Sequence, residues 1–142
     1  MINKMYITAL LGLALVCGCL KESVRVTPLQ KAAAEAYYGT NIHHALEVMQ
    51  AYYVSLTNNV NLPNKAFYYR EKGMLAGRIS LMYVKINDNK LAMCYMADAI
   101  ENMDRYVMAS NGHSHRGTSN EIVQAICALD RGRRTVLMDA DK

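Results

Sequence analysis

The sequence predicts an all-α fold, a small bundle of about five helices, and three observations support this prediction. Apolar residues recur at helical spacing along segment after segment, which is typical of helices with one buried face. Residues that favour helix ends separate these segments. Both prolines, Pro28 and Pro63, stand at or just before the start of such a segment, where a missing amide costs little.

The first two helices are bounded by recognisable end residues. Thr27 can cap the free amides of a helix that Pro28 opens and Gly39 ends. Asn41 is expected to cap a second helix, which should end at the turn-rich residues 57–59. The apolar positions of this second helix share one face and are Ile42, Ala45, Leu46, Met49, Tyr52, Tyr53 and Leu56.

Two longer helices are predicted next, over residues 64–86 and 90–109, joined by a tight turn at residues 87–89. The third helix places an apolar stripe opposite its basic residues, and the stripe consists of Leu75, Ile79, Met82, Tyr83 and Ile86. The fourth helix is apolar nearly all round, and such a helix is expected to be buried. We therefore expect it to be the most central element.

A loop and a fifth helix complete the expected bundle. Residues 110–117 have the composition of a loop, and Thr118 with Glu121 three residues later forms a capping box. The helix that follows should end near Asp130, with Gly132 as its C-terminal stop. The tail, residues 135–142, is assigned to a short extended segment.

The beginning of the chain has the pattern of a secretory signal peptide. Lys4 gives a positive start, and residues 6–16 form an apolar core of the length used for secretion. Crossing a bilayer takes about 20 apolar residues, and Lys21 with Glu22 ends this run too early. A plain secreted protein or a short N-terminal anchor is the alternative interpretation.

The end of this segment, Val16-Cys17-Gly18-Cys19, resembles the lipobox of bacterial lipoproteins. The resemblance implies that Gly18 is the last residue removed and that Cys19 becomes the acylated, palmitate-bearing N-terminus. Leu20 in place of Asp implies transport to the periplasmic face of the outer membrane. The chain would then divide into a lipoprotein signal peptide (1–18), a lipidated tether (19–26) and a single helical domain (27–142).

The charge and cysteine content fit a domain in that compartment. The net charge falls from +4 to +3 when Lys4 leaves with the leader, which is too small to indicate a nucleic-acid partner. Cys94 and Cys127 then remain, and two interpretations stay open. They form a disulfide in the oxidising periplasm, or they are two buried free thiols.

The turn between the third and fourth helices carries a second resemblance. Small and large apolar residues alternate across it in the manner of one tetratricopeptide-type hairpin, in which small residues let antiparallel helices approach closely. The residues concerned are Ala76, Ile79, Ser80, Tyr83, Asn87, Asp88, Ala92, Met96, Ala99 and Ile100. A related pattern recurs around Gly39, Ala45, Met49 and Tyr52, but 47 residues separate Ala45 from Ala92, against about 34 in that repeat. An ordinary bundle with one close-packed hairpin explains the same residues.

Tyrosine is frequent, with ten Tyr, one Phe and no Trp, and six of the tyrosines form adjacent pairs. Adjacent helical residues point about 100° apart, so one member of each pair should be buried and the other should lie at an edge. Such edges suit protein binding, although core packing explains each single tyrosine as well. The pairs are Tyr37 with Tyr38, Tyr52 with Tyr53, and Tyr68 with Tyr69.

Signs of chemistry are weak, and the sequence predicts neither an enzyme nor a cofactor. His113 and His115 could hold a metal ion with help from His43 and His44, but a solvated loop is the better explanation because no acid or cysteine stands beside them. Phosphate-loop and nucleophile motifs are not found. Glu71 and Asp98 lie on apolar helices. They either serve in acid–base chemistry or mark the solvent-exposed face of a helix, where Lys72 or Arg105 neutralises them, and both interpretations stay open.

The sharpest charge cluster, Arg131, Arg133 and Arg134, follows the fifth helix. It is expected to complement the negative end of that helix. It also suits contact with anionic lipid head groups or an acidic partner.

We therefore expect a lipid-anchored adaptor or assembly factor that binds an envelope protein, such as a secretion or pilus component. Its candidate binding residues lie in the groove between the second, third and fourth helices and are Tyr53, Tyr69, Arg70 and Arg78. Two other classes stay open: an exclusion lipoprotein of a plasmid or phage that blocks entry of related DNA, and a small periplasmic metal-binding protein or enzyme.

Overall fold

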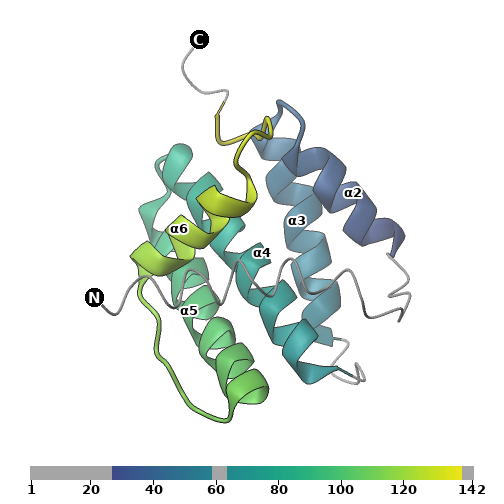
Figure 1. The fold of residues 1–142 in the computed structure, drawn as a ribbon. Helices are drawn as coiled ribbons and strands as arrows, with labels where there is room; N and C mark the ends of the chain where they lie inside the picture. Colours follow the sequence, from purple (N-terminus) through teal and green to yellow (C-terminus); the bar gives the residue numbers. More distant parts are fainter. Residues whose placement is uncertain (1–26, 59–63, 139–142) are drawn as a thin grey trace.

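The computed structural model describes residues 27–58 and 64–138, and this part of the chain is all-α, as predicted (Figure 1). It contains no strand. The expected signal peptide, Cys19 and the tether lie outside the described residues. The helices are α2 (Pro28–Tyr37), α3 (Ile42–Asn58), α4 (Lys65–Lys85), α5 (Asn89–Asn111) and α6 (Ser119–Leu129).

The predicted helix starts are confirmed by their caps. Before four of the helices, a side-chain oxygen accepts a hydrogen bond from an amide of the first turn. The residues that do this are Thr27, Asn64, Asp88 and Thr118. At the start of α3, the Asn41 side chain accepts from the amide of His44 at 3.1 Å. The capping box of Thr118 and Glu121 is complete in both directions.

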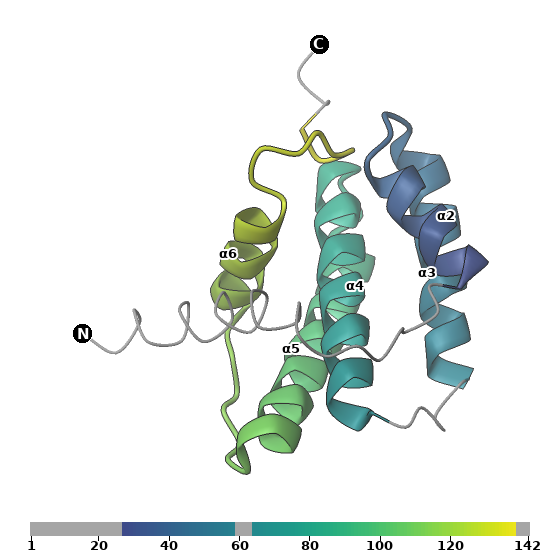
Figure 2. The same cartoon turned by 45° about the vertical axis from the view of Figure 1, so that its right-hand side comes forward.

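Helix α4, rather than the apolar α5, is the central element. In Figures 1 and 2 it lies between α2 and α3 on one side and α5 and α6 on the other. The expectation for α5 is wrong because part of its apolar surface faces solvent, with Met93 74% and Met108 53% exposed. Glycine lets other helices pack closely on α4. A Cβ added at Gly77 would lie only 2.8 Å from atoms of Ile122 and of Ile126 on α6.

Helices α4 and α5 form the close-packed antiparallel hairpin that the sequence predicts. Ala76 and Ala99 are fully buried in it, and the Ser80 hydroxyl donates a 2.7 Å hydrogen bond to the carbonyl of Ala92. Asn87 makes the turn possible by adopting a φ of 64°, a conformation that asparagine tolerates better than most residues. This hairpin agrees with an ordinary bundle, and the tetratricopeptide resemblance stays a prediction.

The segment after α6 returns to α2. The amide of Val136 donates to the carbonyl of Tyr37 at 2.9 Å, and the Lys85 ammonium donates to the carbonyl of Val136 at 2.5 Å. The expectation of an extended tail is wrong for its described part, because residues 136–138 form a turn. Residues 139–142 lie outside the described part. No helix in the described ranges is long and apolar enough to span a membrane.

Candidate functional site

A group of polar aromatic residues, here called the tyrosine seam, lies where α3, α4 and α5 meet. It consists of Gln50, Tyr53, Tyr83, Tyr95 and Asp98. The Tyr53 hydroxyl donates a 2.5 Å hydrogen bond to Asp98 Oδ2, and its ring meets that of Tyr95 edge to face, with centroids 5.5 Å apart. Tyr83 stacks on Tyr95, with ring centroids 5.7 Å apart. The three rings therefore form one continuous aromatic row.

Hydrogen bonds hold the hydroxyl ends of this row. Gln50 Nε2 donates to the hydroxyl oxygens of Tyr83 at 2.6 Å and Tyr95 at 3.1 Å. Burial, followed by the hydrogen bond to Asp98 and the charge of Asp98, raises the pKa of Tyr53 well above its ordinary value. The phenol of Tyr53 therefore stays neutral, and it remains a hydrogen-bond donor, at physiological pH.

Two cations lie on tyrosine rings beside the seam. The Lys72 ammonium is 5.1 Å from the ring centroid of Tyr53, and the Arg105 guanidinium is 5.8 Å from that of Tyr69. The sequence suggested that these two cations neutralise Glu71 or Asp98. In the structure Arg105 pairs instead with Glu101, one turn away on α5. Both cations lie within the range of a cation–π contact.

The adjacent tyrosines confirm the expectation of one buried member in each pair. Tyr37, Tyr52 and Tyr68 are at most 8% exposed, whereas Tyr38, Tyr53 and Tyr69 are half-buried. The half-buried members keep part of each ring accessible. Tyr53 and Tyr69 therefore lie at the surface of the bundle, as the predicted binding surface requires.

Arg78 does not join Tyr53 and Tyr69. It follows Tyr69 by nine residues on α4, so the two side chains point to opposite sides of the helix. Arg78 instead faces α2 and the end of α6, where its guanidinium donates a 2.7 Å hydrogen bond to Asp130 Oδ1. Arg70 follows Tyr69 directly and is half-buried. Arg78 thus lies across α4 from Tyr69, and Arg70 points about 100° away from Tyr69.

Asp130 is a buried charged residue whose pairing across the bundle was not predicted from the sequence. It is 4% exposed, and it accepts hydrogen bonds from both the Tyr37 hydroxyl, at 2.5 Å, and Arg78. The guanidinium of Arg78 also lies 4.9 Å from the Tyr37 ring centroid. Burial lowers the pKa of Arg78, but the charge of Asp130, the hydrogen bond to it and the nearby Tyr37 and Tyr38 together outweigh burial, so the net shift of this pKa is upward. The sequence marked Asp130 only as a helix end.

The two carboxylates considered for acid–base chemistry have separate partners. Asp98 on α5 accepts from Tyr53. Glu71 on α4 accepts from Gln30 Nε2 at 3.3 Å and from the Tyr52 hydroxyl at 3.2 Å. Each carboxylate therefore accepts a hydrogen bond from a different tyrosine of α3.

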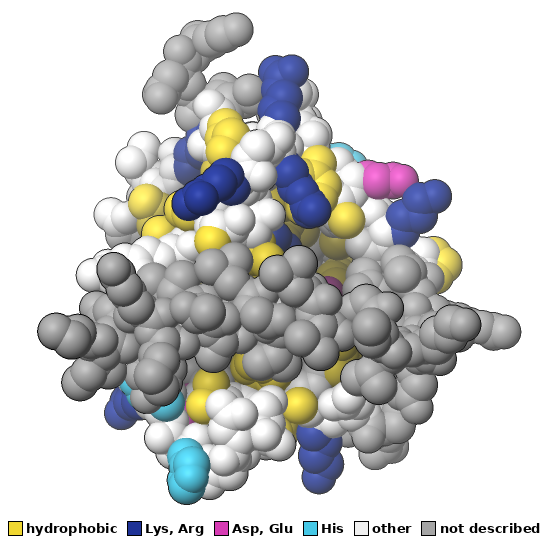
Figure 3. All heavy atoms as spheres, viewed as in Figure 1, with side chains coloured by type: hydrophobic (Ala, Val, Ile, Leu, Met, Phe, Trp, Pro, Cys, Tyr) yellow, Lys and Arg dark blue, Asp and Glu magenta, His cyan; other side chains and the backbone are white. Residues whose placement is uncertain are grey.

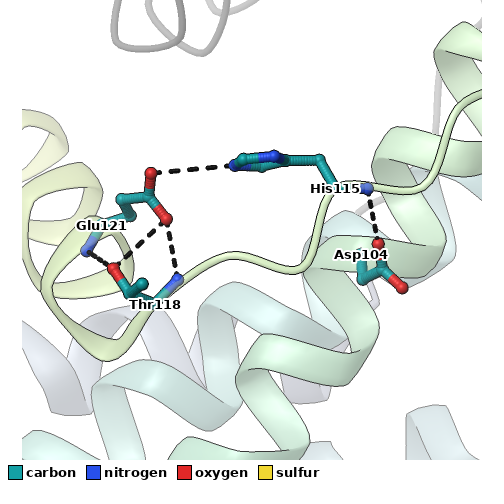
Figure 4. A network of polar contacts seen from close by, with 4 residues as sticks. All are labelled: Asp104, His115, Thr118 and Glu121. Atoms are coloured by element: carbon teal, nitrogen blue, oxygen red, sulfur yellow. Dashed lines mark hydrogen bonds and ion pairs between the residues drawn. The ribbon is translucent and has the colours of Figure 1, made fainter. Parts of the chain in front are cut away.

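The histidine loop is held by acids on both flanking helices (Figure 4). Asp104 Oδ1 accepts from the amide of His115 at 2.8 Å, and His115 Nε2 lies 3.7 Å from Glu121 Oε1. His113 is exposed. Across residues 27–58 and 64–138, no three His, Cys, Asp or Glu side chains are grouped as a metal site requires. The contacts with Asp104 and Glu121 hold the loop in place between α5 and α6.

Cys94 and Cys127 are free and exposed, on α5 and α6 respectively. The structure therefore contains no bond between them, and the alternative that both thiols are buried is wrong. Their neighbours Ala92 and Ile126 are buried, so each cysteine lies on the outer side of an amphipathic helix.

The three arginines after α6 are all exposed. Arg133 Nη1 donates to the hydroxyl of Tyr38 at 2.9 Å, and its guanidinium lies 5.6 Å from that ring centroid. Figure 3 shows basic side chains on the upper part of this face, toward the C-terminal segment. This end of the bundle is therefore positively charged.

Comparison with known proteins identifies no relative of this chain. No protein-family model, no curated protein and no solved structure matches the chain.

Proposed function

We propose that this protein is a periplasmic lipoprotein, anchored at Cys19 to the outer membrane, that acts as a binding adaptor or assembly factor for another envelope protein. The anchor rests on the resemblance of residues 16–19 to a lipobox. The binding role rests on the tyrosine seam, and the secretion or pilus component that the sequence suggested is the class of partner proposed.

The observation that carries the binding role is the pre-ordered, half-buried Tyr53. Its hydroxyl is fixed by Asp98 at 2.5 Å, its ring lies against Tyr95, and Lys72 lies 5.1 Å from the ring centroid. Tyrosine is enriched among the residues that dominate protein interfaces, because it offers a large apolar ring and a hydroxyl at a small cost in conformational entropy. A tyrosine already held by neighbours loses still less freedom on binding.

The proposed contact surface centres on Tyr53 and Tyr69, with Arg70, which points about 100° away from Tyr69 on α4, at its edge. Val54 on α3 is 55% exposed beside Tyr53, so an apolar side chain accompanies the aromatic ones. Arg78 is excluded from this surface, because its guanidinium is taken by Asp130 on the other side of α4.

Photocrosslinking in the native envelope tests the surface. A photoreactive phenylalanine at position 69 should give a discrete crosslinked species, and the same group at Gln124, exposed on α6, should not. Adding Tyr53→Ala should remove the species, whereas Glu47→Ala, on an exposed position of the same helix, should leave it. An identical crosslinking pattern at positions 69 and 124 would contradict the proposal.

A further inference from the structure

The three arginines after α6 are held at one end of the bundle. The residues that follow them, Thr135 and Val136, are 1% and 2% exposed, and Val136 is hydrogen-bonded to both α2 and α4. Figures 1 and 2 show this segment beside the turn between α2 and α3. The arginines are therefore displayed on a segment that the core holds in place.

The positive charge of this segment is not cancelled by acids within it. Asp130, just before the arginines, is 4% exposed and paired with Arg78, and residues 131–138 contain no acid. Asp139 and Asp141 follow in the sequence, outside the described residues, together with Lys142. Figure 3 shows basic side chains over the upper part of this face. This end of the bundle therefore suits an anionic partner.

Apolar side chains are exposed at the same end. Met138 is 58% exposed, Val84 at the end of α4 is 51% exposed, and Leu129 at the end of α6 is 38% exposed. A membrane interface accepts both kinds of side chain, because its head groups bind the cations and its acyl boundary takes up apolar groups. The mixture of arginines and apolar residues therefore favours a lipid surface over an acidic protein.

The length of the expected tether allows such a contact. Residues 19–26 separate the lipidated cysteine from Thr27, and eight residues reach at most about 28 Å when extended. The basic end lies one length of α2, about 15 Å, from Thr27. A membrane in contact with the arginines is therefore within reach of a lipid on Cys19.

We propose that this end of the bundle lies on anionic phospholipid head groups of the membrane that holds the anchor, with the arginines on the phosphates and Met138 in the interface. The proposal rests on the lipid anchor of the proposed function. Because Tyr69 lies about 24 Å along α4 from Lys85 at the basic end, α4 would direct the tyrosine contact surface away from the membrane. An envelope protein could then reach that surface.

Quenching by brominated lipids tests the contact, because the chain contains no tryptophan and a single introduced one can report depth. Met138→Trp places the reporter at the basic end. Met108→Trp places it at the far end of α5, on a methionine of similar exposure, 53%. In the acylated full-length protein, brominated phosphatidylglycerol should quench the reporter at position 138 and not the one at position 108. About 1 M NaCl, which shortens the Debye length to about 3 Å, should reduce the quenching at position 138.

Charge variants separate lipid binding from simple closeness to the anchor. A basic residue at an anionic surface contributes about a fivefold gain in affinity, so Arg131→Gln with Arg134→Gln should weaken the contact about 25-fold. Lys65→Gln with Arg116→Gln removes two exposed cations from the start of α4 and the α5–α6 loop and should leave the quenching unchanged. Equal quenching of the two reporters, or equal quenching in the two double variants, would overturn the proposal. No quenching at position 138 would also overturn it and would leave an acidic protein as the partner of the arginines.

The intact mass distinguishes a failure of this surface from a failure of the anchor. If the protein carries no acyl chains, the proposed lipoprotein is wrong, and the same reporters are measured with the unlipidated full chain added to the vesicles. Quenching at position 138 that requires phosphatidylglycerol rather than phosphatidylcholine would then support the lipid surface without the anchor. Its absence would overturn both.

Discussion

Tyr37 and Asp130 stand 93 residues apart in the chain, yet the Tyr37 hydroxyl donates a 2.5 Å hydrogen bond to Asp130 Oδ2 in the protein interior. Arg78 on α4 donates to the other carboxylate oxygen at 2.7 Å. A single carboxylate thus joins α2, α4 and the end of α6. The segment after α6 extends the same connection through the bond between Val136 and the Tyr37 carbonyl.

The first prediction concerns this carboxylate. Asp130→Asn leaves the partly buried Arg78 without its counter-charge, and removing the buried partner of such an ion pair costs about 3 kcal/mol. Urea unfolding followed by circular dichroism should show a loss of this size in the free energy of unfolding. Glu101→Gln breaks the exposed pair with Arg105 and should cost less than about 1 kcal/mol. Equal losses in the two variants would contradict the structural role of Asp130.

The second prediction concerns Gly77, where α4 approaches α6. An added Cβ would lie 2.8 Å from Ile122 Cγ2 and from Ile126 Cδ1. Overpacking costs about 1–3 kcal/mol, while alanine gains about 1 kcal/mol over glycine within a helix. Gly77→Ala should therefore lower the free energy of unfolding by about 1 kcal/mol. Ile126→Val removes one of the two clashing methyl groups, so a double-mutant cycle by urea unfolding should show favourable coupling; strict additivity would contradict the contact.

The third prediction is a loss of stability at alkaline pH. Burial is the first cause that raises the pKa values of Tyr37, Tyr52 and Tyr53 above their ordinary 10.0, and nearby carboxylates add to it. Because the folded pKa is the higher one, the stabilisation is complete below the unfolded value. This stabilisation is lost as pH rises from the unfolded pKa of each tyrosine towards its folded pKa. The urea midpoint should therefore fall between about pH 9 and about pH 11, and Tyr53→Phe should reduce that fall.

The fourth prediction concerns the exposed Cys94 and Cys127. Both thiols should react with a maleimide in the folded protein, because neither requires unfolding to reach the reagent. Intact mass of a variant in which Cys17 and Cys19 are changed to Ser should show two adducts without denaturant, and prior treatment with a reductant should not change that number. Labelling that requires either denaturant or reductant would show that one of the thiols is buried or bonded.

The sequence predicted the helices well because their ends are specified locally. Thr27, Asn64 and Asp88 each cap the helix that follows, through contacts within three residues. The one-buried, one-edge arrangement of the adjacent tyrosines was also predictable, since it follows from the angular spacing of helical residues.

Packing between helices was less predictable, because it depends on distant residues. Gly73 and Gly77 weaken α4 as an isolated helix, yet their lack of side chains is what lets α5 and α6 approach it. The separation of Arg78 from Tyr69 was predictable from their nine-residue spacing on α4, but the pairing of Arg78 with Asp130 was not, because the sequence context of Asp130 indicated only a helix end. Polar groups that pair across the bundle carry no local signal for that pairing.

The fifth prediction concerns Cys19, which the lipobox resemblance marks as the acylated residue. The protein extracted from membranes should have the mass expected for cleavage before Cys19 plus its acyl chains. Cys19→Ser should lack this added mass, because serine offers no sulfur for the diacylglycerol that precedes cleavage. The variant should also fail to partition into detergent, since stable anchoring depends on the buried acyl methylene groups. An unlipidated mass for the unmutated protein would contradict the anchor and would remove the main support for an envelope adaptor, while the tyrosine seam would still require an explanation.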